Sequence, residues 1–331
     1  MSTSRQIVEC TAANEIRATG SAFDPAEFEV ERADVHLVVV EDHAGPVAYC
    51  SLWWSHVPKV PNQRIGAIGH YRAGNEGAAQ LLLAAACDRL RRVGCTLAIG
   101  PMNGNTWRRY RFVTDAGDEP AFFLEPYNPP QWPQHFVSAG FGLLTTYFSA
   151  LNTDLSQKVR RLTRAEKRLR LLGVALRPLK PGELDVYLPR FHRLCCEAFR
   201  NNFLYSELSQ DNFIRQYAGI LPLLRPDLVL IAEQNTDLVG FILAAPDHLR
   251  AARGLPADTF IIKTVAIRPR RELGGLGALL VGEAQRIGRQ IGFRRCIHAL
   301  MHERNRLALN ISDASAKPMR RYALFAKDLQ V

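Results

Sequence analysis

The same order of predicted elements occurs twice along this chain, and this internal repeat constrains the fold more than any other feature. In each copy a strand leads through a glycine-containing turn into an amphipathic helix, the helix stops at a glycine, and an apolar strand follows. Two strands joined by a tight turn precede each copy. The repeated units span 35–53 and 64–99 in the first half and 228–244 and 260–300 in the second, and final strands follow over 143–151 and 320–329. We therefore expect an α/β protein of two similar domains, each with a central twisted mixed sheet flanked by helices.

Chain length agrees with two domains, because 331 residues exceed the size of one average domain. We place the boundary near residue 155, which gives domains over 1–155 and 156–331. The stretch 157–172 is basic, has helical spacing and contains neither Gly nor Pro. It therefore predicts a helix that connects the two domains.

The formal net charge of +10 is concentrated in one segment. Between residues 156 and 182 the basic side chains are Lys158, Arg160, Arg161, Arg164, Lys167, Arg168, Arg170, Arg177 and Lys180. Such a segment is either a solvated linker helix or a docking site for a phosphorylated cofactor or an acidic carrier protein. Nucleic acid is an unfavoured partner, because no helix-turn-helix, zinc-finger or aromatic RNA-binding signature accompanies the charge.

Cysteine usage and hydropathy exclude several classes of protein. The seven cysteines are an odd number without a C-x-x-C pair, which indicates reduced thiols and no metal site. No run of 18 apolar residues is present, and the first residues have neither the basic start nor the apolar region of a signal peptide. We therefore expect a cytoplasmic protein with no membrane partner.

The most informative local feature is the strand, turn and helix over 265–280, whose turn contains Gly274, Gly275 and Gly277. Amide groups at a helix N-terminus lack intrahelical acceptors, and glycines let an anion approach them closely. Three arginines add positive charge beside the turn: Arg268, Arg270 and Arg271. The pattern favours a diphosphate site over a plain connecting turn. It does not match the Rossmann fingerprint, because the glycines have a different spacing. It does not match the P-loop, because no Gly-Lys-Ser/Thr element is present.

The segment 265–280, the following strand over 296–301 and Asn305 beyond it resemble the GNAT superfamily of acyl-coenzyme A-dependent N-acyltransferases. The resemblance covers 178–329. The first half, about 35–151, is similar to a diverged copy, so the whole chain resembles a tandem-GNAT protein. This implies that the second half binds acyl-coenzyme A. The first half is then a scaffold or recognises the acceptor.

The resemblance also implies which residues hold the cofactor. Main-chain groups of Val265 and Ile267 would pair with the pantetheine arm as an added strand, and Asn305 would contact it. Glu272 stands where the family usually has Gln or Arg, so the diphosphate would depend on main-chain amides. Those amides belong to Leu273, Gly274, Gly275, Leu276, Gly277 and Ala278.

Acyl transfer to an amine needs a base that removes the ammonium proton and an acid that protonates the leaving thiolate. We expect His302 to be the base, with a purely structural histidine as the alternative. His298 stands four residues earlier and would share a face with it if the strand continues. The family's usual tyrosine acid falls on Ser312 here, so Ser312 or Tyr322 would replace it.

Four further residues are candidates for binding the acceptor. Lys263, on the strand before the glycine turn, would orient an acidic group of the substrate. Asn202 and Tyr205 follow a predicted amphipathic helix that would border the acceptor, and Glu303 follows His302. The loop 103–110 of the first half is rich in polar and aromatic groups, which suits either recognition or an ordinary surface loop.

These observations favour an N-acyltransferase that moves an acetyl or longer acyl group from coenzyme A to a primary amine of a small molecule. Two alternatives remain. The acyl donor would be the phosphopantetheine thioester of an acyl carrier protein, or the protein would bind coenzyme A as a non-catalytic scaffold.

Overall fold

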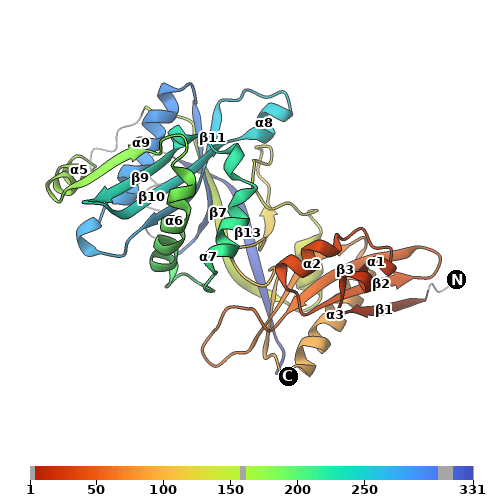
Figure 1. The fold of residues 1–331 in the computed structure, drawn as a ribbon. Coiled ribbons are helices and arrows are strands. Elements are labelled where there is room, and N and C mark those ends of the chain that lie inside the picture. Colours follow the sequence, from red (N-terminus) through yellow and green to blue (C-terminus); the bar gives the residue numbers. More distant parts are fainter. Residues whose placement is uncertain (1–3, 157–161, 305–315, 331) are drawn as a thin grey trace.

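The computed structural model describes residues 4–156, 162–304 and 316–330. Within these ranges a 13-stranded sheet of mixed strand directions runs through the molecule, and helices lie on its faces. Figure 1 shows two lobes, joined where the long strands β7 (Gly142–Asn152) and β13 (Lys317–Asp328) lie side by side. The predicted α/β class with a mixed sheet flanked by helices is confirmed.

The first half contains the predicted hairpin and the predicted strand, helix and strand. Before β7, its elements are β1 (Arg5–Cys10), α1 (Ala13–Ala18), α2 (Pro25–Glu31), β2 (Val35–Glu41), β3 (Gly45–Trp53), β4 (Ile65–Ala73), α3 (Glu76–Arg92), β5 (Leu97–Gly100), β6 (Phe112–Asp115) and α4 (Trp132–Ser138).

The second half repeats this order with two additional helices. Its helices are α5 (Leu162–Leu171), α6 (Leu184–Phe199), α7 (Gln210–Ala218), α8 (His248–Ala252) and α9 (Leu276–Gln290), with short 3-10 turns η1 (Leu221–Leu223), η2 (Pro226–Leu228) and η3 (Arg271–Leu273). Its strands before β13 are β8 (Val174–Pro178), β9 (Val229–Gln234), β10 (Asp237–Pro246), β11 (Thr259–Ile267) and β12 (Arg295–His302). The additional helices are α5, which precedes the repeated order, and α8, which lies between the hairpin and β11. The predicted linker helix is present as α5 in the described part of that stretch.

The final strands of the two halves are exchanged. β7, from the first half, pairs antiparallel with β12 of the second half, and β13, from the second half, pairs antiparallel with β5 of the first. β7 and β13 also pair with each other. Both predicted final strands therefore exist, but each one completes the sheet of the other half. The division of the chain near residue 155 lies between β7 and α5 and stays a prediction, because the sheet itself continues across it.

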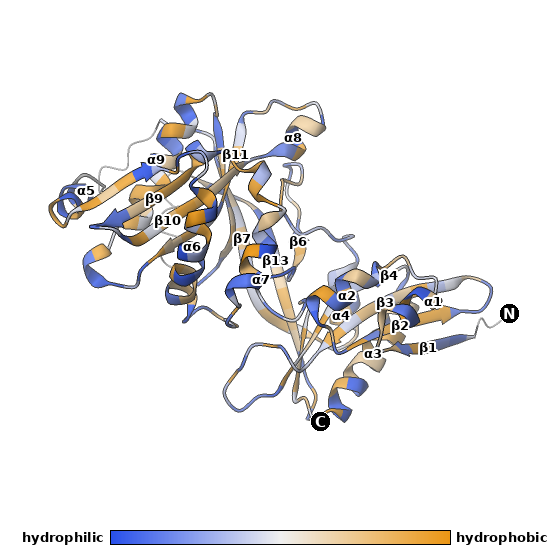
Figure 2. Ribbon diagram, in the orientation of Figure 1, coloured by the Kyte–Doolittle hydropathy of each residue, from blue (hydrophilic) through white to orange (hydrophobic). Residues whose placement is uncertain are grey.

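Hydrophobic side chains explain why each helix lies on its sheet. α3 buries Leu82, Leu83 and Leu90 against the strands of the first half, and α9 buries Leu276 and Leu280 against β9–β11. Figure 2 shows hydrophobic colours along the strands and hydrophilic colours on the outer sides of the helices. No described helix is both long and apolar enough to cross a membrane.

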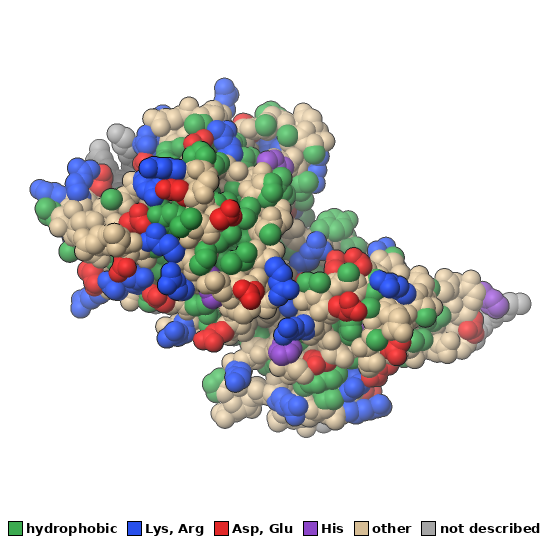
Figure 3. Space-filling view, in the orientation of Figure 1, with side chains coloured by type: hydrophobic (Ala, Val, Ile, Leu, Met, Phe, Trp, Pro, Cys, Tyr) green, Lys and Arg blue, Asp and Glu red, His purple; other side chains and the backbone are tan. Residues whose placement is uncertain are grey.

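Charged side chains of both signs are interspersed over the face of the molecule seen in Figure 3. The basic segment contributes the exposed cations of α5, among them Arg164, Lys167 and Arg170. One of them, Arg170, forms an ion pair with Glu166 at 3.3 Å on the same helix.

Candidate functional site

The strands β11 and β12 separate in the middle of the second half. They run parallel and pair from Thr259 with Arg295 to Ile262 with His298. Beyond these pairs β11 continues to Ile267 along β10, and β12 continues along β7. We call this separation the β11–β12 splay. Beyond Ile262, no strand of the described residues pairs with the edge of β11 that faces the splay.

The open edge of β11 has the geometry to bind an extended ligand. The amide of Arg268 donates to the carbonyl of Val239 at 2.9 Å, and Ala266 lies opposite Phe241 on β10. Main-chain groups alternate in direction along a strand, so those of Val265 and Ile267 point to the side of the splay. The main-chain groups of Val265 and Ile267, which the family resemblance implied would pair with the pantetheine arm, are thus accessible from the splay.

The glycine turn follows this edge and ends in a helix N-terminus without a side-chain cap. Gly275 has φ 88°, a conformation that favours glycine, and α9 begins at the next residue. The first intrahelical bond runs from the Leu279 amide to the Gly275 carbonyl at 3.1 Å, so helix geometry leaves the amides of Leu276, Gly277 and Ala278 without intrahelical acceptors. The prediction that the amides of Leu273 and Gly274 bind the diphosphate is wrong, because they donate to the carbonyls of Arg270 and Arg271 at 3.1 Å and 3.2 Å in the preceding turn. Leu273 and Leu276 are buried in the core and fix the turn.

The cations at this turn differ in availability. Arg268 is paired with Glu197 at 3.0 Å and Asp237 at 3.6 Å, which holds its side chain on the α6 side of the sheet. Arg270 and Arg271 are exposed, and the described residues place no carboxylate within ion-pair distance of either. They are therefore the two arginines of the turn that can meet an anion.

A third cation reaches the turn from α5. The Arg168 guanidinium donates to the Gly274 carbonyl, and a Cβ atom built on Gly275 would lie 2.9 Å from the Cβ of Ala165. The basic helix therefore packs on the glycine turn. Sequence reasoning identified the charge of this segment but not its position.

Two further cations lie at the closed end of the splay. Lys263 is the first residue of β11 after the last pair with β12, and it is half-buried. Arg111, from the first half, is buried between the rings of Tyr110 and Tyr147, with its Cζ 3.7 Å and 4.0 Å from their centroids. Burial lowers the pKa of Lys263, and the Arg111 charge lowers it further.

No known family profile matches the chain, and no curated protein matches it. Solved structures do. A "GCN5-related glucosamine N-acetyltransferase region" of a fungal multi-domain β-N-acetylglucosaminidase has a TM-score of 0.56 at 15% identity, over 99% of this chain and 38% of that one. A GCN5-related N-acetyltransferase from Sphaerobacter thermophilus and a tandem GNAT protein from the clavulanic acid biosynthesis pathway both have a TM-score of 0.51 at 13% identity. The Sphaerobacter match covers 98% of this chain and 96% of that protein. The clavulanic acid pathway match covers 99% of both chains.

This chain has the tandem GNAT fold. The assignment rests on matches that extend over both halves and on the order of strands around the splay. The chain spans 38% of the fungal protein, which carries further domains by its description.

His302 lies in the tandem GNAT fold at the end of β12, half-buried against Tyr147. Its Nδ1 accepts from the Arg304 amide at 3.0 Å, so Nε2 carries the proton that is donated to Thr145 Oγ1 at 2.9 Å. Burial lowers the pKa of His302, and the nearby charges of Arg304 and Arg111 lower it further. Both ring nitrogens are therefore engaged, and the assignment of His302 as the base stays a prediction.

The expected shared face of His298 and His302 is wrong. Leu300 between them has φ 58°, and the pairing of β12 with β7 shifts at this point. This bulge turns the two histidines to different surroundings. His298 is buried and lies 3.1 Å from Gln285 of α9, which is on the core side.

The other predicted catalytic residues lie away from the splay or outside the described residues. Tyr322 is fully buried, and its hydroxyl bonds to the Glu125 carboxylate and to Ser149. Burial and the adjacent Glu125 charge raise its pKa. Ser149 accepts from the Leu300 amide at 2.9 Å, so Tyr322 supports the β12 bulge through Ser149. Two predicted residues fall outside the described part of the chain: Ser312 and Asn305.

Of the predicted acceptor residues, Glu303 is turned away from His302. Thr146 donates to its carboxylate, and Arg321 pairs with it at 3.0 Å, whereas His302 contacts Thr145. Thr145 and Thr146 are neighbours on β7, so their side chains lie on opposite faces of the sheet.

Asn202 and Tyr205 lie in the segment between α6 and α7. Asn202 is exposed, while the Tyr205 hydroxyl is buried beside the Cys196 thiol and its pKa is raised by burial. The loop 103–110 of the first half packs on this segment, since Trp107 Nε1 donates to the Ser206 carbonyl at 2.8 Å. The Trp107 ring also lies 6.3 Å from that of Tyr205. The two halves are thus in contact beside the splay.

The corresponding separation in the first GNAT unit is closed by the chain itself. β4 and β5 pair from Ile65 with Leu97 to Ala67 with Ile99. Beyond this point Met102 donates to the Ile68 carbonyl at 2.8 Å, the Asn103 side chain accepts from the His70 amide at 2.9 Å, and Trp132 Nε1 donates to the Ala73 carbonyl at 3.3 Å. Phe136 is fully buried over Gly100, where a Cβ atom would lie 2.6 Å from its ring.

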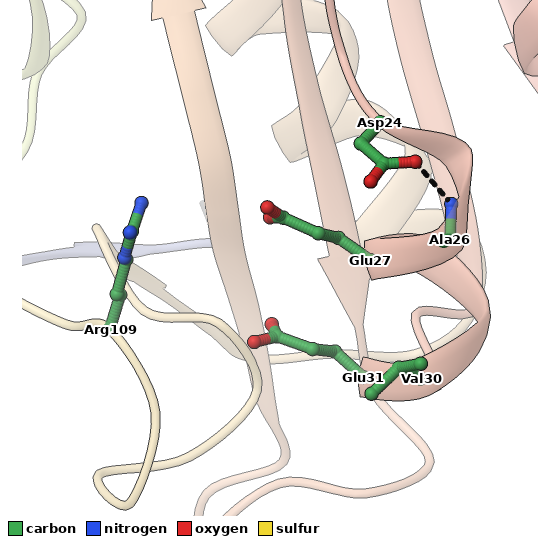
Figure 4. Close-up of a pocket in the computed structure, with 6 residues that line it drawn as sticks. All are labelled: Asp24, Ala26, Glu27, Val30, Glu31 and Arg109. Atoms are coloured by element: carbon green, nitrogen blue, oxygen red, sulfur yellow. Dashed lines mark hydrogen bonds between the residues drawn. The ribbon is translucent and has the colours of Figure 1, made fainter. Parts of the chain in front are cut away.

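A depression of about 330 Å³ lies between α2 and the loop that carries Arg109 (Figure 4). Glu27 and Glu31 point toward Arg109 across it, and Asp24 caps α2 through the Ala26 amide at 2.9 Å. Glu31 accepts from His70 at 2.9 Å, and His70 continues to Ser51 at 2.9 Å. This Ser–His–Glu chain is no nucleophilic site, because Ser51 is fully buried.

The described residues contain no cluster of three or more His, Cys, Asp or Glu side chains that could hold a metal ion.

Proposed function

We propose that this protein transfers an acyl group from acyl-coenzyme A to a primary amine. One observation carries the proposal: the open edge of β11, the glycine turn and the uncapped N-terminus of α9 follow one another along the same side of the splay. The edge suits the amides of a pantetheine arm, and the helix N-terminus with Arg270 and Arg271 suits a diphosphate. Among solved structures of this fold, one is described as a glucosamine N-acetyltransferase region.

The reaction forms an N–C bond between the neutral amine and the thioester carbonyl carbon, and it breaks the C–S bond. The thiolate leaves with little help because a free thiol has a pKa of about 8.5. A main-chain amide of β11 near Val265 would donate to the carbonyl oxygen. The amine proton passes to solvent or to a base beside the splay, and His302 serves this role only after it releases the Arg304 amide.

Calorimetry and thiol release test this proposal together. We expect acetyl-coenzyme A to bind at least about tenfold more tightly than acetyl-pantetheine, which lacks the diphosphate. A thiol-specific reagent should then detect free coenzyme A when a suitable amine is added. Equal affinity for both donors would reject the diphosphate site. Tight binding without thiol release for any amine would favour the non-catalytic scaffold.

A carrier-protein donor is a second candidate, and the position of α5 favours it. Exposed cations of this helix lie beside the glycine turn, where an acidic protein would present its phosphopantetheine. Faster thiol release from a loaded carrier than from the same acyl-coenzyme A would select this donor. The α5 charge reversals Arg164→Glu and Lys167→Glu should then slow only the carrier reaction.

A further inference from the structure

Lys263 and Arg111 are two cations at the closed end of the splay, and neither has an anionic partner among the described residues. Thr264 pairs with Leu243 and Ile262 with Ala244, so Lys263 is the extra residue of a β-bulge. Arg111 reaches the same part of the splay, because its guanidinium donates to the carbonyl of Leu300, two residues beyond His298, the last residue of β12 that pairs with β11. Within residues 4–156, 162–304 and 316–330, no carboxylate forms an ion pair with either side chain.

This lack of a counter-charge is unusual in the molecule. Two other buried arginines are paired with acids: Arg320 lies 2.8 Å from Glu125, and Arg250 lies 3.7 Å from both Glu119 and Asp258. A buried cation normally needs such a partner, because its desolvation is costly. Arg111 instead has two aromatic faces and one carbonyl, that of Leu300 at 3.1 Å.

The backbone also holds Arg111 in a costly conformation. Its φ of 72° lies in the left-handed region, which disfavours side chains, and its amide is fixed to the Pro101 carbonyl at 2.9 Å. Its bonded amide, the two rings and the Leu300 carbonyl together hold the Arg111 guanidinium at the splay. Rigid, partly desolvated cations are well suited to bind an anionic group of a ligand.

We propose that the acceptor amine carries an anionic group, a carboxylate or a phosphate, which Arg111 and Lys263 bind together. The inference rests on the proposed function, because the acyl thioester would lie along β11 next to this pair. It makes the first half a direct part of the acceptor site through Arg111. Lys263 is then a substrate-binding residue, as the sequence suggested, and Arg111 is its missing partner.

Matched amines test this inference. Rates of thiol release from acetyl-coenzyme A are compared for β-alanine against β-alaninamide, other amino acids against their amides, and phosphoethanolamine against ethanolamine. We expect the anionic member of at least one pair to have a kcat/KM at least about tenfold higher. The better anionic class identifies the carboxylate or the phosphate as the source of the charge.

The variants Lys263→Met and Arg111→Gln should each remove that preference by raising the KM for the anionic amine, while acetyl-coenzyme A affinity measured by calorimetry stays within about threefold. Arg109→Gln is the matched control, since it removes one charge from the same loop at an exposed position. If Arg111→Gln does not fold, Lys263→Met and Arg111→Lys carry the test. Equal use of neutral and anionic amines by the unmodified protein overturns the inference alone. Absence of coenzyme A binding overturns the proposed function and the inference with it.

Discussion

The two halves of this molecule share one fold and differ in what lies at their separated strands. In the first half, the edge of β4 is bonded by Met102, Asn103 and Trp132, and Phe136 fills the space above Gly100. In the second half, no strand in the described part of the chain pairs with the edge of β11 beyond Ile262, and α9 begins without a side-chain cap.

The difference shows that the fold alone does not create a binding site. Strand separation provides an edge, but an edge whose polar groups are satisfied by the chain has nothing to offer a ligand. The first half instead supplies residues to the second, because Arg111 reaches the splay and Trp107 contacts the α6–α7 segment.

The largest expected effect concerns the side chain that closes the first half. Phe136→Ala should lower the free energy of unfolding by about 3–5 kcal/mol, since Phe136 is fully buried and its loss leaves a cavity. Urea unfolding measures the change. Tyr127→Ala, at a ring that is 84% exposed, should change stability by less than about 0.5 kcal/mol. Similar losses for both variants would show that Phe136 does not close the first half.

The next effect concerns pH and the core of the second half. Burial lowers the pKa of His298 to about 4, whereas an unfolded histidine has a pKa of about 6.5. The unfolded chain therefore binds this proton more readily as pH falls below about 6.5, and stability decreases until about pH 4. We expect His298 to account for a loss on the order of 2 kcal/mol between about pH 7 and about pH 5.

Urea unfolding over this pH range tests the assignment to His298. His298→Gln should flatten the decrease, and the exposed control His56→Gln should leave it unchanged. An unaltered slope in His298→Gln would contradict burial of His298 as its source.

The smallest expected effect is the difference in unfolding free energy between two glycine substitutions, one at a residue that contacts α5 and one at a residue that does not. Gly275 and Gly292 have φ angles of 88° and 103°, but only at Gly275 would a Cβ meet a neighbour, Ala165 at 2.9 Å. Gly292→Ala should cost about 1–2 kcal/mol, and Gly275→Ala about 1 kcal/mol more. Equal losses in urea unfolding would show that α5 does not pack on the turn.

The sequence predicted most of the local structure. Alternation, glycine stops and hairpin turns predicted the repeated strands and helices of both halves, and the turn at Gly275 leads into an uncapped helix as expected. Seven shorter elements were not predicted: β1, α1, α2, β6, β8, α7 and α8. These features depend on neighbouring residues, which a single sequence displays directly. The mixed sheet was predicted from their order, and the tandem GNAT fold was implied by the resemblance of residues 265–280 and 296–301 to that superfamily.

Long-range features were missed for a physical reason. The alternating pattern of β7 and β13 marks each as a strand but carries no information on which sheet it joins. Arg111 and Arg168 act on partners far away in the chain, Leu300 and Gly274. The bulge at Leu300 separated His298 from His302 although their spacing suited one face. One signal was visible: Arg111 directly follows the polar and aromatic loop 103–110.

The central claim is that the amides at the start of α9 bind a diphosphate, and one substitution tests it most directly. Ala278 is the third residue of α9, where a glutamate side chain reaches back to the amide of Gly275, the residue that precedes the helix. Carboxylates at this end stabilise a helix, so Ala278→Glu should fold normally while it occupies the anion site. Calorimetry should show acetyl-coenzyme A affinity reduced at least about 100-fold in Ala278→Glu, and by a clearly smaller factor in Ala278→Gln, which reaches the same amide without adding a negative charge. Undiminished affinity in the folded Ala278→Glu variant would contradict the account.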